Sequence, residues 1–297
     1  MEFLLLRFVL LLLAPLSWNG SRRVGRLLGS FAAGALRLRW KVTLDNLRHA
    51  FPERSEVERS AIARAAYREI GTTFLEMFRS LRPGEASTRC DSFAAELLRD
   101  ALDEGRGAIL LTGHFGNWEL LGAAVADGGW PLHAVVATQK NRWIDALVTR
   151  RREAVGLKIL RSDAGLRPIL RALKSNQIVC FLADQDAGRT GHFVPFLGRP
   201  ASSPGGPARF ARLARCPILV GFSVRSPGGR YRFEFGNLIR IREDLPSEEA
   251  EKQATAEIAA LLEERIRRYP EQWFWMHRRW KTRPPGETTG PGPSEGP

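Results

Sequence analysis

Between residues 108 and 235, short apolar runs alternate with amphipathic segments, and this alternation constrains the fold more than any other feature. An apolar run of five or six residues that ends at a turn residue is typical of a buried strand, and a 3.6-residue apolar period is typical of a helix. Strands separated by helices indicate βαβ units, so we predict an α/β fold with a mainly parallel mixed sheet flanked by helices. The predicted strands are 108–112, 132–137, 158–160, 178–183, 217–224, 230–235 and 238–241, and the predicted helices among and after them are 117–126, 143–154, 166–174, 207–215 and 247–269.

The first third of the chain is predicted to be helical. Residues 32–51 form one predicted helix, which Pro52 ends. Ser55 and Glu58 then have the spacing of a capping box, which predicts a long helix to about Leu81. A further helix is predicted over 92–104, and a Gly/Pro/Ser-rich loop over 188–206.

The amino terminus predicts a membrane-associated helical extension. Residues 3–18 are apolar except for Arg7 and Ser17, and many arginines follow. The run is shorter than the roughly 20 residues that cross a bilayer comfortably, so the helix either spans with an extension or lies in the interface. A cleaved signal peptide is the competing interpretation, but no convincing small-x-small cleavage site follows.

The net charge indicates the kind of binding partner, and the cysteines indicate the redox compartment. The formal net charge of +13 indicates an acidic partner, and the apolar run beside basic residues favours anionic membrane lipid over nucleic acid. The segment 267–281, with three Trp among basic residues, has the composition of a membrane interface; stacking on nucleic acid is the rival. Cys90, Cys180 and Cys216 are single and far apart, which argues against a disulfide framework and fits a reducing compartment.

His114 is the first candidate catalytic residue. It follows Gly113 at the end of the predicted strand 108–112, at the sheet edge where ligands of α/β proteins bind. Histidine takes a proton near neutral pH, and a carboxylate such as Glu119 can orient its ring. Because no Ser or Cys nucleophile lies nearby, we predict a base that activates a substrate hydroxyl. The alternatives are a surface turn or a buried structural histidine; the spacing does not match a zinc motif.

Two further sites are candidates. Asp184 directly follows the predicted strand 178–183, so a parallel sheet brings it to the same edge as His114. Alternatively, Asp184 caps a turn or pairs with a structural arginine. Arg152, in a run of three arginines near a helix end, is suited to bind phosphate or stabilise an oxyanion, although such a run is more often a solvated basic face. The apolar loop within 191–209 either covers an apolar substrate or packs in the core.

Five blocks together resemble the late acyltransferases of lipid A biosynthesis and the related glycolipid and phosphatidylinositol mannoside acyltransferases. The resemblance extends from the amino terminus to about Arg283. The blocks are His114-Phe-Gly-Asn-Trp-Glu119, Arg152-x3-Gly156, Asp184-Gln-Asp186, Phe193-Val-Pro-Phe-x-Gly-Arg-Pro200 and Tyr269-Pro-Glu-Gln-Trp-x-Trp-x-His-Arg-Arg-Trp-Lys281.

The resemblance implies transfer of an acyl group from an acyl carrier protein thioester, or from acyl-CoA, to a hydroxyl of a lipid acceptor at the cytoplasmic side of the inner membrane. It implies that His114 is the general base, that Glu119 or Asp184 orients it, and that Arg152 stabilises an oxyanion or phosphate. We also predict substrate contacts for Asn117, Arg199 and Arg209. No metal, no cofactor and no covalent acyl-enzyme are required, and we expect a monomer whose basic surface receives the acidic carrier protein.

The resulting organisation is an anchor helix over 1–30, an acyltransferase domain over 31–285 and a disordered tail over 286–297. The acceptor is expected to be a lipid A precursor. Phosphatidylinositol mannoside, ornithine lipid and lysophospholipid are alternatives, and a non-catalytic basic module that binds membrane or nucleic acid is a rival of another class. The sequence does not give the acyl length or the acceptor.

Overall fold

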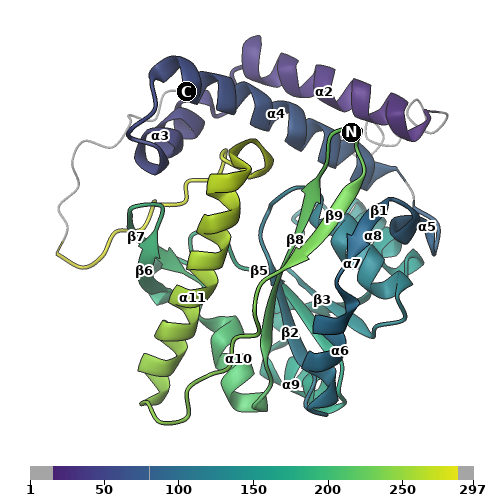
Figure 1. The fold of residues 1–297 in the computed structure, drawn as a ribbon, viewed down its shortest axis with the longest axis vertical. Helices are drawn as coiled ribbons and strands as arrows, with labels where there is room; N and C mark the ends of the chain where they lie inside the picture. Colours follow the sequence, from purple (N-terminus) through teal and green to yellow (C-terminus); the bar gives the residue numbers. More distant parts are fainter. Residues whose placement is uncertain (1–15, 80, 287–297) are drawn as a thin grey trace.

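A computed structural model describes residues 16–79 and 81–286 and contains a seven-stranded sheet of order β1-β9-β8-β2-β5-β3-β4 (Figure 1). The strands from β8 to β4 run parallel to one another; β9 is antiparallel to β8, and β1 is parallel to β9. The predicted α/β fold with a mainly parallel mixed sheet is therefore confirmed. The sheet strands are β1 Cys90–Phe93, β2 Ala108–Thr112, β3 Leu132–Val136, β4 Lys158–Arg161, β5 Ile178–Leu182, β8 Ile218–Arg225 and β9 Tyr231–Phe235.

Helices cover both faces of the sheet. One core lies between the sheet and α9, α10 and α11, and a second lies between the opposite face and α6 and α7. Strand β2 shows the two-sided burial directly, because Ile109 and Leu111 belong to the first core and Leu110 to the second. The helices are α2 Trp18–Gly34, α3 Trp40–Ala50, α4 Glu56–Phe78, α5 Glu85–Thr88, α6 Ala95–Asp103, α7 Trp118–Asp127, α8 Arg142–Ala154, α9 Leu166–Lys174, α10 Gly206–Ala214 and α11 Ser247–Arg268, with 3₁₀ turns η1 Ser162–Ala164, η2 Gly188–Thr190 and η3 Pro270–Gln272.

The helices α2 and α4 lie side by side across one end of the molecule (Figure 1). The predicted capping box starts α4: Ser55 accepts from the Glu58 amide, and the Glu58 carboxylate accepts from the Ser55 amide. Gly29 of α2 permits close contact of the two helices, since a Cβ there would overlap the Tyr67 backbone. Within the ranges 16–79 and 81–286, no helix is long and apolar enough to cross a bilayer. Residues 1–15, which carry most of the predicted anchor, lie outside the described residues, as do residues 287–297 of the predicted tail.

Four predicted elements are wrong. The helix predicted over 32–51 is broken between α2 and α3, where Arg37 and Arg39 have positive φ. The helix predicted from Ser92 begins only at Ala95, because β1 occupies its start. The strand predicted over 238–241 is reduced to one bridge between Ile218 and Ile239. The loop predicted over 188–206 contains a hairpin of β6 His192–Phe196 and β7 Arg199–Ser203.

The three Trp of the aromatic-basic segment that follows α11 are buried in the core, contrary to the prediction that they lie at a membrane interface. Trp273, Trp275 and Trp280 are at most 7% exposed and belong to the first core. Arg279 is also buried and donates to the Ser202 carbonyl and the Ser203 hydroxyl of β7. The segment therefore closes the core beneath the hairpin, and its guanidinium satisfies buried polar atoms there.

Candidate active site

A cavity of about 850 Å³ opens at the carboxyl edge of the parallel strands, and His114 lines it. This volume falls within the range of about 300–1,000 Å³ that is typical of ligand pockets. The polar lining includes Glu119, Arg152 and Gln185. Much of the remaining wall is aliphatic or aromatic and includes Phe74, Trp118, Val135, Val136, Ile144, Val148, Ile169, Phe181, Phe210 and Phe274. The cavity thus joins an ionisable cluster to space suited to a hydrocarbon chain.

The register of the sheet brings His114 and Asp184 together. Thr112 of β2 is paired with Leu182 of β5, so the residues two positions beyond these strand ends are neighbours. The Nδ1 atom of His114 is 2.8 Å from Oδ1 of Asp184, and the His114 backbone amide donates to Oδ2 of the same carboxylate at 2.7 Å. Trp273 Nε1 also donates to Oδ2, at 2.8 Å. Asp184 therefore holds both the ring and the backbone of His114.

The electrostatics favour an ion pair between these two groups. Burial acts to raise the pKa of Asp184, but His114 and the hydrogen bonds from His114 and Trp273 outweigh it and lower that pKa to about 2. Burial likewise acts to lower the pKa of His114, but the negative charges, above all that of Asp184, raise it above its usual value. The carboxylate thus stays ionised and stabilises an imidazolium if His114 takes a proton.

Glycine at position 116 shapes the loop that carries His114. Gly116 has φ +55°, and a Cβ there would overlap the Ser223 carbonyl of β8, so a side chain is excluded on both grounds. The loop also pairs with the segment after α11: the Phe274 amide donates to the His114 carbonyl at 3.1 Å, and the Gly116 amide donates to the Gln272 carbonyl at 2.8 Å. The segment 270–276 therefore forms one side of the site.

Glu119 and Arg152 form the second ionic pair in the cavity wall. Glu119 lies in the first turn of α7, and Arg152 in the last turn of α8. Arg152 Nε and Nη2 donate to the two carboxylate oxygens of Glu119 at 2.9 and 2.5 Å, in a bidentate arrangement. Of the two acids considered for His114, the one at hydrogen-bonding distance from its ring is Asp184, and Glu119 holds Arg152 in the cavity wall.

The structure does not place the three residues predicted to contact substrate in the cavity wall. Asn117 caps α7, where its side chain accepts from the Leu120 amide and donates to Glu76 at 2.9 Å, so its polar atoms are engaged within the protein. Arg199 lies in β7, and Arg209 is exposed on α10. Contact of Asn117 and of these two arginines with substrate stays a prediction.

Sequence reasoning missed the aromatic side chains around His114. The ring centroid of Trp118 lies 5.0 Å from that of His114, and Phe274 lies 6.1 Å from it. Trp118 lies within the motif His114–Glu119, so the sequence places it near the base. Phe274 and Trp273 belong to the segment 267–281, whose composition predicts a membrane interface instead. In the described part of the chain, no three His, Cys, Asp or Glu side chains converge as a metal site.

Comparison with known proteins gives a consistent result. The family described as bacterial lipid A biosynthesis acyltransferase matches residues 2–282. The chain is 31% identical to the lipid A biosynthesis lauroyltransferase of Escherichia coli K12, over 94% of this chain and 90% of that protein. It is 30% identical to the palmitoleoyltransferase of the same strain, over 90% and 86%. It is 26% identical to a phosphatidylinositol mannoside acyltransferase of Mycolicibacterium smegmatis, over 74% and 72%. The chain therefore belongs to the bacterial lipid A biosynthesis acyltransferase family and is an acyltransferase.

Proposed function

We propose that this acyltransferase moves an acyl chain from an acyl carrier protein thioester to a hydroxyl of a lipid A precursor, with His114 as the general base. The observation that carries the proposal is the His114–Asp184 pair in the wall of a largely apolar cavity. Because Nδ1 is engaged by Asp184, Nε2 is the nitrogen left to accept a proton. The adjoining apolar wall supplies space for the acyl chain.

The reaction needs one base and no enzyme nucleophile. His114 Nε2 removes the proton of the acceptor hydroxyl as its oxygen attacks the thioester carbonyl carbon. The tetrahedral intermediate then collapses, the C–S bond breaks, and the imidazolium returns its proton to the departing thiolate sulfur. Asp184 stabilises the transient imidazolium, and general-base catalysis of this kind contributes about 10²–10⁴ in rate.

Arg152 is the proposed stabiliser of negative charge. Its guanidinium lines the cavity, and the bidentate pair with Glu119 holds it in one orientation. A fixed cation near the carbonyl oxygen, or near a phosphate of the acceptor, acts without reorganising during the reaction. The pair thus gives Glu119, the acid of the His114 motif, a positioning role.

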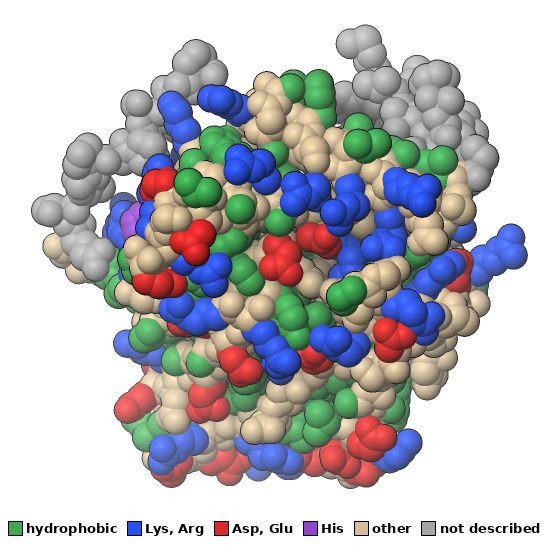
Figure 2. Space-filling model, turned by 45° about the horizontal axis from the view of Figure 1, so that its top comes forward, with side chains coloured by type: hydrophobic (Ala, Val, Ile, Leu, Met, Phe, Trp, Pro, Cys, Tyr) green, Lys and Arg blue, Asp and Glu red, His purple; other side chains and the backbone are tan. Residues whose placement is uncertain are grey.

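The proposed site of action is the cytoplasmic surface of the inner membrane. Figure 2 shows basic and hydrophobic side chains interspersed on the face turned toward the viewer, which includes the end of the molecule that carries α2 and α4. Leu27, Leu28 and Phe31 of α2 are 49–69% exposed. Apolar side chains beside arginines suit the boundary between anionic head groups and acyl chains. This arrangement supports α2 lying in the interface.

A panel of four candidate lipids tests which acceptor the enzyme uses. The purified chain in anionic vesicles is given radiolabelled acyl carrier protein thioester together with a lipid A precursor, phosphatidylinositol mannoside, ornithine lipid or lysophospholipid. We expect label to enter the lipid A precursor fastest. The likeness to a phosphatidylinositol mannoside acyltransferase makes that glycolipid the second candidate, and faster labelling of it would replace the first. Binding to vesicles without label transfer to any lipid would contradict the proposed acyl donor or show that the acceptor is a lipid outside this panel.

A further inference from the structure

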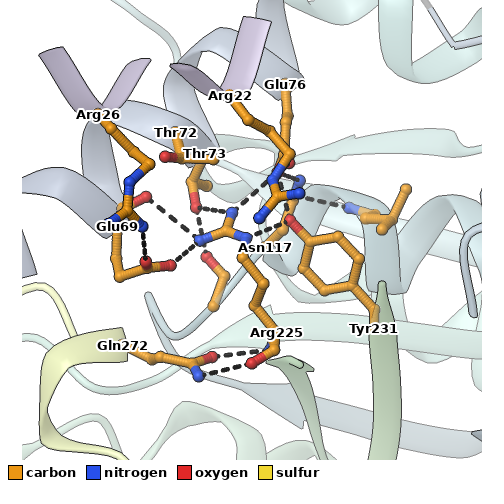
Figure 3. Close-up of polar contacts among 12 residues, drawn as sticks. Arg22, Arg26, Glu69, Thr72, Thr73, Glu76, Asn117, Arg225, Tyr231 and Gln272 are labelled. Atoms are coloured by element: carbon orange, nitrogen blue, oxygen red, sulfur yellow. Dashed lines mark hydrogen bonds and ion pairs between the residues drawn. The ribbon is translucent and has the colours of Figure 1, made fainter. Parts of the chain in front are cut away.

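A buried polar cluster contacts the His114 loop at Gly116 and Asn117, whereas Asp184 contacts it at His114. It consists of Glu69, Thr73 and Glu76 of α4, Arg225 at the end of β8 and Tyr231 at the start of β9. Figure 3 shows the side chains of these residues converging on the Arg225 guanidinium. We call this set the Arg225 cluster.

The guanidinium of Arg225 is saturated by the cluster. Its Nε donates to the Tyr231 hydroxyl at 2.8 Å, and its Nη1 is paired with the Glu69 carboxylate. Its Nη2 donates to Thr73 Oγ1 at 3.0 Å and to Glu76 Oε2 at 2.8 Å. The side chain is only 4% exposed. Such a set of contacts allows a single orientation of the guanidinium.

Glu76 is the second centre of the cluster. Its fully buried carboxylate accepts from Arg225, from the Tyr231 hydroxyl and, at 2.9 Å, from the Asn117 amide. Burial raises the pKa of Tyr231 well above its ordinary value, so its hydroxyl keeps its proton and donates to Glu76. Arg22 of α2 approaches the other oxygen of Glu76 at 3.9 Å, which extends the cluster to the amino-terminal helix.

Three sets of contacts connect this cluster to the His114 loop, two through the Gly116 backbone and one through the Asn117 side chain. Thr73 Oγ1, which accepts from Arg225, donates to the Gly116 carbonyl at 2.7 Å. Asn117, the next residue, is held by Glu76. Gln272, whose carbonyl accepts from the Gly116 amide, exchanges side-chain hydrogen bonds with the Arg225 backbone amide and carbonyl at 2.8 and 3.0 Å.

A buried ionic network is weak evidence for stability, since well-packed apolar residues of similar volume are often as stable. The network has a clearer effect on the position of the His114 loop than on stability. The carbonyl and amide of Gly116 lie two residues from the proposed base, and a misplacement of about 1 Å in a catalytic group costs on the order of 10²-fold in rate. The contact of the cluster with Gly116 therefore complements the contact of Asp184 with His114.

We propose that the Arg225 cluster is a positioning device for the His114 loop, with Thr73 as the residue that transmits its geometry to the loop backbone. This inference rests on the proposed role of His114. The residues of the Arg225 cluster do not line the His114 cavity, so we assign them a positioning role and not a catalytic one.

The test compares two neighbouring threonines of α4. Thr73→Val keeps the shape and removes the hydroxyl that contacts Gly116. Thr72→Val is the matched control, because Thr72 is equally buried and its hydroxyl donates only within the helix, to the Arg68 carbonyl at 2.8 Å. Both variants are prepared as full-length chain in vesicles and assayed with an acyl carrier protein thioester and a lipid A precursor, with kcat and both KM values measured.

For Thr73→Val we expect kcat to fall about tenfold to a hundredfold while both KM values stay within about twofold. Thr72→Val should retain the wild-type kcat, and Thr73→Ser, which restores the hydroxyl, should recover most of the rate. Equal effects of the two valine variants, or a Thr73→Ser variant as slow as Thr73→Val, would overturn the proposal. Comparing thermal unfolding of all three separates a positioning effect from a loss of folded protein.

A double variant separates this proposal from the one on which it rests. In a His114→Ala background, Thr73→Val should have no further effect on the residual rate, because the residue it positions is gone. The same proportional loss in both backgrounds would contradict positioning of His114. If His114→Ala is inactive and Thr73→Val is fully active, the positioning proposal fails alone; if His114→Ala transfers at the wild-type rate, the proposed base fails and the positioning role falls with it.

Discussion

The position of His114 could be predicted from the sequence, but the acid that orients its ring could not. Its place at a strand end indicated a sheet-edge site, and parallel pairing of two strands indicated that Asp184 would be near. The sequence could not show whether Glu119 or Asp184 orients His114, because that depends on the direction in which each side chain points. Glu119 turns toward Arg152, a residue 33 positions later. Sequence spacing carries no information on such a preference.

At this scale the pH dependence gives a test. The active form of the base is neutral imidazole, so kcat should rise with pH through the pKa of His114, which Asp184 raises. In Asp184→Asn that charge is lost and burial lowers the pKa, so the acidic limb should move to lower pH while the maximal kcat falls by on the order of 10³-fold or more.

The measurement is kcat across the pH range at saturating substrates, with Glu251→Gln as the control. Glu251 pairs with Arg212 on the helices α11 and α10, away from the His114 loop, and its loss should leave the profile in place. An acidic limb that stays at the same pH in Asp184→Asn would show that another group controls the rate.

Among the elements, the buried parallel strands were the easiest to predict, since β2 and β5 are short apolar runs buried on both faces. The β6–β7 hairpin was missed because Pro195 and Pro200, which face each other across it, are typical of loops. The aromatic segment after α11 was misassigned because Trp among basic residues has the same composition in a core as at an interface. Only the fold distinguishes the two.

The α2–α4 contact gives a prediction about an element. Gly29→Ala places a Cβ against the Tyr67 backbone, and overpacking of this kind costs about 1–3 kcal/mol, so Tm should fall by several degrees. Gly34→Ala is the matched control at the end of the same helix, where no atom lies within 4 Å of the added Cβ, and it should leave Tm equal or slightly higher. Thermal unfolding followed by circular dichroism measures both; equal Tm values would mean that α2 is not packed on α4 in solution.

At the scale of the whole molecule, the net charge of +13 indicated an acidic partner but not where that partner binds. The Arg225 cluster could not be predicted from the sequence either, because its members come from α4, β8 and β9 and meet only when the sheet has formed. A pattern of residues predicts local structure and, through sheet topology, the proximity of His114 and Asp184 at the sheet edge. Contacts among three distant elements lie beyond it.

The proposed interfacial face can be tested on the intact chain. Replacing Leu27, Leu28 and Phe31 by Ser removes exposed apolar area without opening the core, so the fold should persist. Binding to anionic vesicles, measured by co-sedimentation, should weaken at least tenfold, and binding of the wild type should weaken with added salt as head-group attraction is screened. Unchanged binding of the triple variant would place the membrane contact elsewhere on the chain.

The central claim is that a single imidazole removes the acceptor proton. Its most direct test is the single-turnover rate of acyl transfer to a lipid A precursor by His114→Ala, in vesicles to which wild type and variant bind equally. We expect the rate to fall by about 10²–10⁴ with membrane binding intact. A variant that transfers the acyl chain at the wild-type rate would contradict the mechanism.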